Sequence, residues 1–159
     1  AAAVDPLGNN PVAPDAQDPM LERAVAQLRT CVADDGRVFL YFNGPDGPAI
    51  PAGEGGPDEF GRFVRSYFTA YGYLGTYHLV GNIQIDFIDD DRARVHSYIN
   101  STHWMAGDRM LLAPIDYNDV VVRDGAVWKI ERRDILVLRF WVTDGYTPDG
   151  NDPTLSRPV

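Results

Sequence analysis

The sequence is poor in cysteine and histidine and has no long apolar run. It contains one cysteine, Cys31, and three histidines in 159 residues. A single cysteine excludes an internal disulfide and the paired-cysteine spacings of zinc and iron–sulfur sites. Every apolar stretch is shorter than the ~18 residues that a transmembrane helix needs, so none is predicted. Cys31 falls on the apolar side of a predicted helix, where a free cysteine is usually buried.

Positive charge is scarce too. The chain carries 14 lysine and arginine residues against 23 aspartate and glutamate residues, which gives a net charge of −9. Binding to a phosphate backbone or an anionic membrane surface requires clustered lysine and arginine, and the sequence has no such cluster. Nucleic acid and membranes are therefore excluded as expected partners, and neutral small molecules are favoured over nucleotides as ligands.

The sequence also lacks the common catalytic fingerprints. It has no GxSxG nucleophile motif, no P-loop, no dinucleotide-binding glycine pattern and no His-x-x-x-His metal motif. Any chemistry must therefore come from side chains that the fold brings together. The chain starts Ala1-Ala2-Ala3 without a methionine, as a processed or trimmed form would, so a cytoplasmic and an exported location are both compatible with it.

Length and composition predict one globular domain. Apolar residues make up 45% of the chain and charged residues 23%, which is ordinary for such a domain. Residues 1–17 are rich in Ala, Pro, Asn and Asp and are predicted to form an irregular arm. Residues 18–142 carry the periodic patterns of the domain. Residues 143–159, with their Asp, Gly and Pro, are predicted to form an irregular tail.

Hydrophobic spacing divides the domain into a mainly helical first half and a second half of long strands. The first half is predicted to contain a helix from Asp18-Pro19 to Asp35-Gly36, a strand over 37–42, a Gly- and Pro-rich loop over 43–57, and a helix over about 58–71. The second half is predicted to contain strands over about 76–88, 92–104, 110–123 and 127–142. The aromatic stripe of the second helix, which includes Phe63, is expected to pack in the core.

These elements predict an α+β fold. Long antiparallel strands must twist and coil, and they bend at bulges. A four-strand meander of this length is therefore expected to form a strongly curved antiparallel sheet with the helices on its concave face. Such a cone has a mouth, where one apolar pocket is expected.

Two of the three histidines are expected to meet in that pocket. A turn near residue 90 places His78 opposite residues 102 and 103, so His78 and His103 lie at the same end of one hairpin. Histidine titrates near neutral pH and can both take and give a proton. The alternative is that each is an ordinary hydrogen-bonded strand residue. His96, beside Arg94 on the opposite face, is expected to be solvated.

One carboxylate is predicted to join this pair. Asp116 alternates with Leu112 and Val120 on the next strand, and a polar residue on a core-facing strand needs a partner or a purpose. Asp116 could orient an imidazole or act as a base. It could also complete a facial metal set with the two histidines. Of the adjacent Arg132 and Arg133, which point oppositely, one could face the pocket.

The whole pattern resembles the NTF2-like superfamily and, within it, the SnoaL-like and scytalone-dehydratase-like groups. The segments that carry the resemblance are TYHLVGN at 76–82, residues 93–98, and DGAVWKI at 124–130, within a match over about 18–142. The resemblance implies an NTF2-like α+β barrel and a cofactor-independent dehydratase, isomerase or cyclase. Its substrate would be a neutral, largely apolar cyclic molecule.

The resemblance also implies a set of site residues and no metal. His78, His103 and Asp116 match catalytic positions, and Tyr41 matches a tyrosine of the pocket. Apart from the resemblance, Asn82, Tyr98, Phe63 and Trp104 are further expected substrate-binding residues. The Tyr-Asp pair that such enzymes carry on a first helix is missing from residues 1–18. A non-catalytic ligand-binding or assembly domain is therefore the alternative. A homodimer or homotrimer is expected, with Tyr98, Trp104, Val121 and Leu138 as an outward contact face.

Overall fold

The computed structural model of the protein describes residues 19–43, 49–107 and 109–144. Within these ranges the chain forms two helices and seven strands, in the order α1 (Pro19–Cys31), β1 (Val32–Phe42), β2 (Ile50–Gly55), α2 (Pro57–Tyr71), β3 (Tyr73–Phe87), β4 (Arg92–Met105), β5 (Arg109–Asp124), β6 (Val127–Val137) and β7 (Trp141–Asp144). The expected arm over 1–17 and residues 145–159 of the expected tail lie outside the described residues.

The helices are set by local signals in the sequence. Proline occupies the first position of each helix, where its missing N–H costs nothing. At the start of α2 the Glu59 carboxylate accepts a hydrogen bond from the Gly56 N–H at 2.6 Å. Gly72 ends α2 in the left-handed conformation, with φ 66°. Arg29 of α1 donates two hydrogen bonds to Asp58 of α2, at 3.0 and 2.5 Å, and so ties the helices together.

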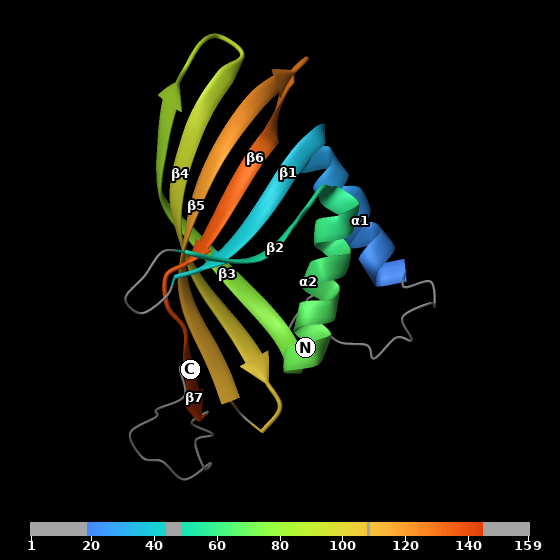
Figure 1. Ribbon diagram of the computed structural model, residues 1–159, viewed down its shortest axis with the longest axis vertical. Helices are drawn as coiled ribbons and strands as arrows, with labels where there is room; N and C mark the ends of the chain where they lie inside the picture. The colour runs from blue at the N-terminus through green and yellow to red at the C-terminus, as the bar shows by residue number, and fades with distance from the viewer. Residues whose placement is uncertain (1–18, 44–48, 108, 145–159) are drawn as a thin grey trace, which may run out of the picture.

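The strands form one large, curved and unclosed sheet of order β2-β1-β6-β5-β4-β3, with β7 paired to β5. Strands β3 to β6 make the predicted meander. β1 runs parallel to β6, so the sheet is mixed and the prediction of a purely antiparallel sheet is corrected. Figure 1 shows the sheet curving around α1 and α2, which lie side by side on its concave face. The α+β fold with helices inside a curved sheet is confirmed.

Interruptions of the strand register produce the bends of this sheet. The pairing of β3 with β4 shifts between Gly81 and Gln84, and that of β5 with β6 shifts between Val120 and Val121. Asn82, inside the first shift, has φ 49°, a left-handed conformation that asparagine tolerates better than most residues. Bulges of this kind increase local twist, which long strands need in order to wrap around helices.

The beginning of the sheet differs from the prediction in two places. The first helix ends at Cys31, and Asp35-Gly36 lies inside β1 at a register shift between Val32 and Arg37. An Asp-Gly pair marks a backbone irregularity without specifying whether a helix or a strand carries it. Residues 50–55, expected to be loop, form β2. Proline and glycine are tolerated there because β2 is an edge strand.

The end of the sheet also differs. The predicted strand over 127–142 is two strands, because β6 stops at Val137 and β7 begins at Trp141. β7 does not continue β6; it pairs with the first residues of β5, from Arg109 opposite Asp144 to Leu112 opposite Trp141. Thr143 and Asp144, which were expected to belong to the irregular tail, therefore form part of the sheet.

The core lies between the concave face and the helices. Its buried members come from β1, α2, β4, β5 and β6 and are Val32, Val38, Phe60, Ile99, Ala113, Ile115, Ile135 and Val137. Apolar residues on the concave face alternate with outward residues along each strand, as the pleat requires. Neither described helix is long and apolar enough to span a membrane.

The close approach of β1 to β6 gives a test of the fold. A Cβ at Gly36 would lie 2.6 Å from the Ile130 carbonyl oxygen and 2.7 Å from Val32 Cγ1. We expect Gly36→Ala to lower the free energy of unfolding by roughly 1–3 kcal/mol, since backbone must move to admit the methyl group. Gly81→Ala is the control, because a Cβ there meets nothing within 4 Å. Equal urea midpoints for the two variants would contradict the prediction.

Candidate functional site

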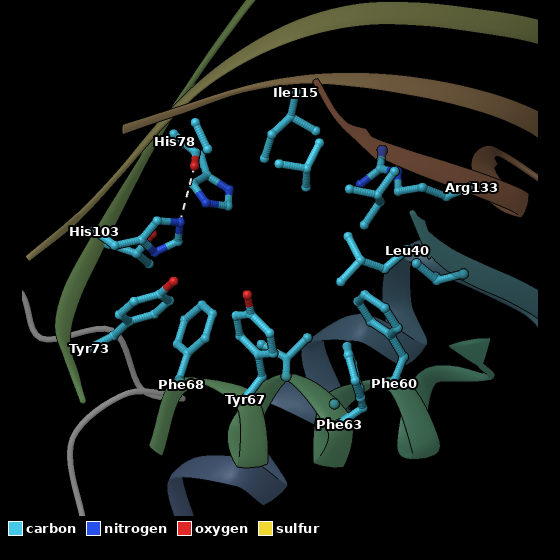
Figure 2. Close-up of a pocket in the computed structure, with 18 of the residues that line it drawn as sticks. Leu40, Phe60, Phe63, Tyr67, Phe68, Tyr73, His78, His103, Ile115 and Arg133 are labelled. Carbon is cyan, nitrogen blue, oxygen red and sulfur yellow. Dashed lines mark hydrogen bonds between the residues drawn. The ribbon is translucent and has the colours of Figure 1, made fainter. Parts of the chain in front are cut away.

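A cavity of about 820 Å³ lies between the concave face and the helices. This volume is within the usual range for small-molecule sites. One wall is the aromatic row of α2, which contributes Phe60, Phe63, Tyr67 and Phe68, as Figure 2 shows. The opposite wall consists of inward side chains of β1, β3, β4, β5 and β6. The cavity is therefore mainly apolar, with a small number of polar groups.

Two histidines meet at one end of this cavity. His78 on β3 pairs in register with Ser101, and His103 on β4 pairs with Thr76. The imidazole centroids are 5.7 Å apart and the rings are nearly perpendicular, at 83°. His78 is exposed, whereas His103 is only 7% exposed. The hairpin geometry expected from the sequence thus brings the two rings together.

Aromatic rings and a serine hold His103. Its ring stacks on Tyr73 at 4.5 Å and meets Phe68 edge-on at 5.6 Å. His103 Nε2 lies 3.1 Å from the hydroxyl of Ser101, which is fully buried. His103 Nδ1 and Thr76 Oγ1 are buried and have no hydrogen-bond partner among the described residues. Buried polar atoms without partners are costly, and they often mark functional positions.

The surroundings of His103 keep it neutral. Burial, with a smaller contribution from the nearby His78, lowers the pKa of His103 from 6.5 to about 4. A neutral imidazole has one N–H donor and one acceptor nitrogen. At neutral pH His103 therefore offers hydrogen bonds to a ligand without carrying a charge.

Two tyrosines add hydroxyl groups beside the histidines. Burial raises the pKa of Tyr67 and of Tyr73, whose rings lie 6.2 Å apart. Both therefore remain protonated at physiological pH. Figure 2 shows their hydroxyl groups directed toward the cavity next to His103. Sequence reasoning placed Tyr67 on the aromatic stripe of a helix and did not single out Tyr73.

An ion pair lies at the other end of the cavity. Arg133 on β6 donates hydrogen bonds from Nε and Nη2 to the carboxylate of Asp119, at 2.8 and 2.6 Å. Asp119 is buried, and the guanidinium lies 4.3 Å from the centre of the Tyr117 ring. The alternation of Arg132 and Arg133 along the strand was a signal that one of them faces inward, and Arg133 is the one.

The predicted position of Asp116 is corrected. Residues 111, 113, 115 and 117 of β5 line the cavity, so Asp116 lies on the convex face, where Oδ2 is 3.9 Å from His96 Nε2. Both faces of β5 carry apolar residues, and alternation alone could not decide between them. No Asp or Glu is present among the described residues that line the cavity. Across the described residues, no group of three His, Cys, Asp or Glu could hold a metal ion.

Of the five expected substrate-binding residues, only Phe63 lines the cavity. Tyr41 stacks on Phe39 outside it, and Tyr98 and Trp104 are about half exposed on the convex face. Asn82 is exposed at the β3 bulge, which shifts its position relative to simple alternation. Cys31 was expected to be buried, but it is exposed and lies at the cavity edge.

Comparison with known proteins gives one family and several solved structures of similar fold. The SnoaL-like domain model matches residues 22–134. No curated protein matches the chain. A scytalone dehydratase candidate from Novosphingobium aromaticivorans is 24% identical, covers 87% of this chain and 83% of its own, and has a TM-score of 0.56.

Two further solved structures share the fold at lower identity. The hexachlorocyclohexane dehydrochlorinase LinA-type3 from Novosphingobium barchaimii is 15% identical, covers 80% and 83% of the two chains, and has a TM-score of 0.60. The β subunit of a candidate aromatic-ring-hydroxylating dioxygenase from N. aromaticivorans is 12% identical, covers 74% and 78%, and has a TM-score of 0.58. At these identities the likeness shows the fold alone.

The lowered pKa of His103 predicts how stability depends on pH. Between pH 6.5 and about pH 4 the unfolded chain binds a proton at His103 that the folded chain does not. The corresponding stability is present above pH 6.5 and is lost as the pH falls, by at most about 3 kcal/mol. We expect His103→Gln to show a smaller loss of unfolding free energy than the unmodified protein between pH 7 and pH 4. Urea unfolding checks this, and parallel pH curves would refute it.

Proposed function

The chain belongs to the SnoaL-like domain family, within the NTF2-like superfamily, and from this premise we propose that it is a cofactor-independent acid–base enzyme. The proposed class is a dehydratase, isomerase or cyclase. Its substrate is a neutral, largely apolar cyclic molecule that binds between the aromatic row of α2 and the concave face of the sheet.

The observation that carries this proposal is the pair of imidazoles in an otherwise apolar cavity. His78 and His103 are 5.7 Å apart, and a substrate at this end of the cavity contacts both rings. Elimination and isomerisation need only a group that takes a proton and groups that stabilise the charge left behind. The side chains already described supply both, which is why the proposal needs no cofactor.

We assign proton transfer to His78. His103 is held neutral by burial and is a weak base at neutral pH, whereas His78 is accessible to a ligand and to water. His78 takes a proton from a carbon next to an electron-withdrawing group, and the electron pair of that C–H bond forms a new double bond. The same proton then goes to the departing hydroxyl in a dehydration, or to a second carbon in an isomerisation, so the enzyme returns to its starting state.

The proposed role of His103 is to donate a hydrogen bond to the oxygen on which negative charge develops. This role uses the tautomer with the proton on Nε2, the nitrogen near Ser101. Nδ1 is then the acceptor nitrogen; it is buried and has no hydrogen-bond partner among the described residues, and the same holds for the hydroxyl of Thr76, its cross-strand neighbour. The phenols of Tyr67 and Tyr73 are further neutral donors for the same oxygen.

The three histidines provide an internally controlled test. We expect His78→Ala to reduce kcat/KM by about 10²–10⁴-fold and His103→Ala by on the order of 10²-fold, since each loses one proton-transfer or charge-stabilising group. His96→Ala should be close to the unmodified enzyme, because His96 pairs with Asp116 on the convex face. Turnover is measured by absorbance on a panel of cyclic β-hydroxyketones. Full turnover in both cavity variants would reject the proposal.

A second candidate function is a binding or assembly domain of the same fold. The observation in its favour is an exposed apolar surface on the convex face, where Tyr77, Leu79, Tyr98 and Trp104 are each roughly half exposed. Across the β3–β4 pair Tyr77 is diagonal to Trp104 and Leu79 is diagonal to Tyr98, so the four side chains lie near one another on one face. Contiguous apolar patches of this kind usually mark a protein interface. The cavity also lacks a lining carboxylate among the described residues, which a purely binding role does not need.

The patch predicts a homodimer or homotrimer for either function. We expect Trp104→Lys to shift the protein toward the monomer, because a charge would be buried in the apolar contact. Ile50→Lys is the control, since Ile50 is an exposed apolar residue on β2, at the edge of the sheet remote from the patch. Light scattering after gel filtration gives the mass. A monomeric unmodified protein at high concentration would contradict this prediction.

A further inference from the structure

Arg133 presents hydrogen-bond donors to the cavity that the protein does not use. A guanidinium has five N–H bonds. Two of them are donated to Asp119, through Nε and Nη2. The remaining three have no partner among the described residues, although the guanidinium lines the cavity. Figure 2 shows the Arg133 side chain on the opposite side of the cavity from the two imidazoles.

The position of this guanidinium is fixed in advance of binding. Two parallel hydrogen bonds to one carboxylate hold it in a plane, and Asp119 is only 6% exposed. The face of the Tyr117 ring, 4.3 Å from the guanidinium carbon, supports it from one side. A donor group held this rigidly loses little conformational entropy when it binds a ligand.

The net charge of the Arg133–Asp119 pair determines which kind of ligand atom can accept hydrogen bonds from Arg133. Asp119 already balances the positive charge of Arg133, so the pair as a whole is neutral. A ligand carboxylate would be repelled by Asp119 and would also have to leave water for an apolar cavity. A neutral oxygen acceptor, such as a ring carbonyl, gains the hydrogen bonds without either cost.

We propose that Arg133 is a substrate-binding residue that selects a neutral cyclic ligand with a carbonyl oxygen at the end remote from the histidine pair. The inference rests on the proposed function, because it names the substrate class of the same cavity. The carbonyl fixes the orientation of the ring system, and the opposite end of the ligand then faces His78 and His103.

The neighbouring residue gives a matched control. Arg132 points to the opposite face and makes the same kind of contacts, with hydrogen bonds to Asp134 and a distance of 4.3 Å to the Phe39 ring. Asp134 is not among the cavity-lining residues, and neither is Arg132. The main difference between the two arginines is that the Arg133 side chain lines the cavity and the Arg132 side chain does not.

The experiment compares ligands that differ by one carbonyl. 1-Tetralone and its hydrocarbon, tetralin, are titrated by calorimetry into the unmodified protein and three variants. Arg133→Met combined with Asp119→Leu removes the cavity pair without leaving a buried unpaired charge. Arg132→Met combined with Asp134→Leu removes the outer pair. Arg133→Lys is a milder third variant, used if the Arg133→Met, Asp119→Leu protein does not fold. It keeps the positive charge and loses the planar guanidinium with its two parallel hydrogen bonds.

The ratio of the two Kd values is the readout. We expect the unmodified protein and the outer-pair variant to bind the ketone about tenfold or more tighter than the hydrocarbon. The cavity-pair variant should lower the ratio most, because only the donors at the histidine end then remain, and Arg133→Lys should lower it less. An unchanged ratio in folded cavity-pair or Arg133→Lys protein would overturn the inference. Tighter binding of 1-naphthoate than of 1-tetralone to the unmodified protein would do so as well.

The binding experiment on Arg133 and the turnover experiment on the histidines can fail independently of each other. Turnover in His78→Ala tests the proposed function, whereas the difference in Kd ratio between the cavity-pair and outer-pair variants tests the contact with Arg133. A ratio that depends on Arg133, together with no turnover in any protein, would support the inference and reject the acid–base enzyme. Turnover that depends on His78, with a ratio independent of Arg133, would do the reverse.

Discussion

The cavity depends on the packing of α2 against the concave face of the sheet. Large aromatic side chains along one side of this helix hold the backbone of α2 away from the strands, while the bulges in β3 and β5 bend the sheet around it. Close packing fills most of the space between the two layers around Phe60. A cavity remains between α2 and the concave face, so the site depends on how the long strands curve around the helix.

The same packing decides the chemistry of the polar groups in the cavity. Tyr73 and Phe68 cover the His103 ring, and this burial, more than the neighbouring His78, lowers the pKa of His103. Two neighbouring histidines in water would titrate alike. Here the difference in burial gives one accessible ring and one neutral ring, and the proposed division of roles between His78 and His103 rests on that difference.

Polar groups at opposite ends of an apolar cavity make its two ends different. The histidine end has imidazoles and phenols, which exchange protons or donate hydrogen bonds. The Arg133 end has a guanidinium whose charge is balanced by Asp119, so it offers hydrogen bonds without a net charge. A ligand that matches both ends can bind in only one orientation. This is consistent with selection of a neutral cyclic molecule in a protein of net charge −9.

The sequence by itself determined the α+β class, the second helix, the four-strand meander and the meeting of His78 with His103. These follow from local periodicity and from the hairpin turn, which fixes register within one pair of strands. Tertiary structure alone decided that β1 runs parallel to β6, that 50–55 is an edge strand, and that Asp116 points away from the cavity while Asp119 and Arg133 meet at it. The reason is physical: on a strand with apolar residues on both faces, alternation separates the faces but does not say which one the helices cover.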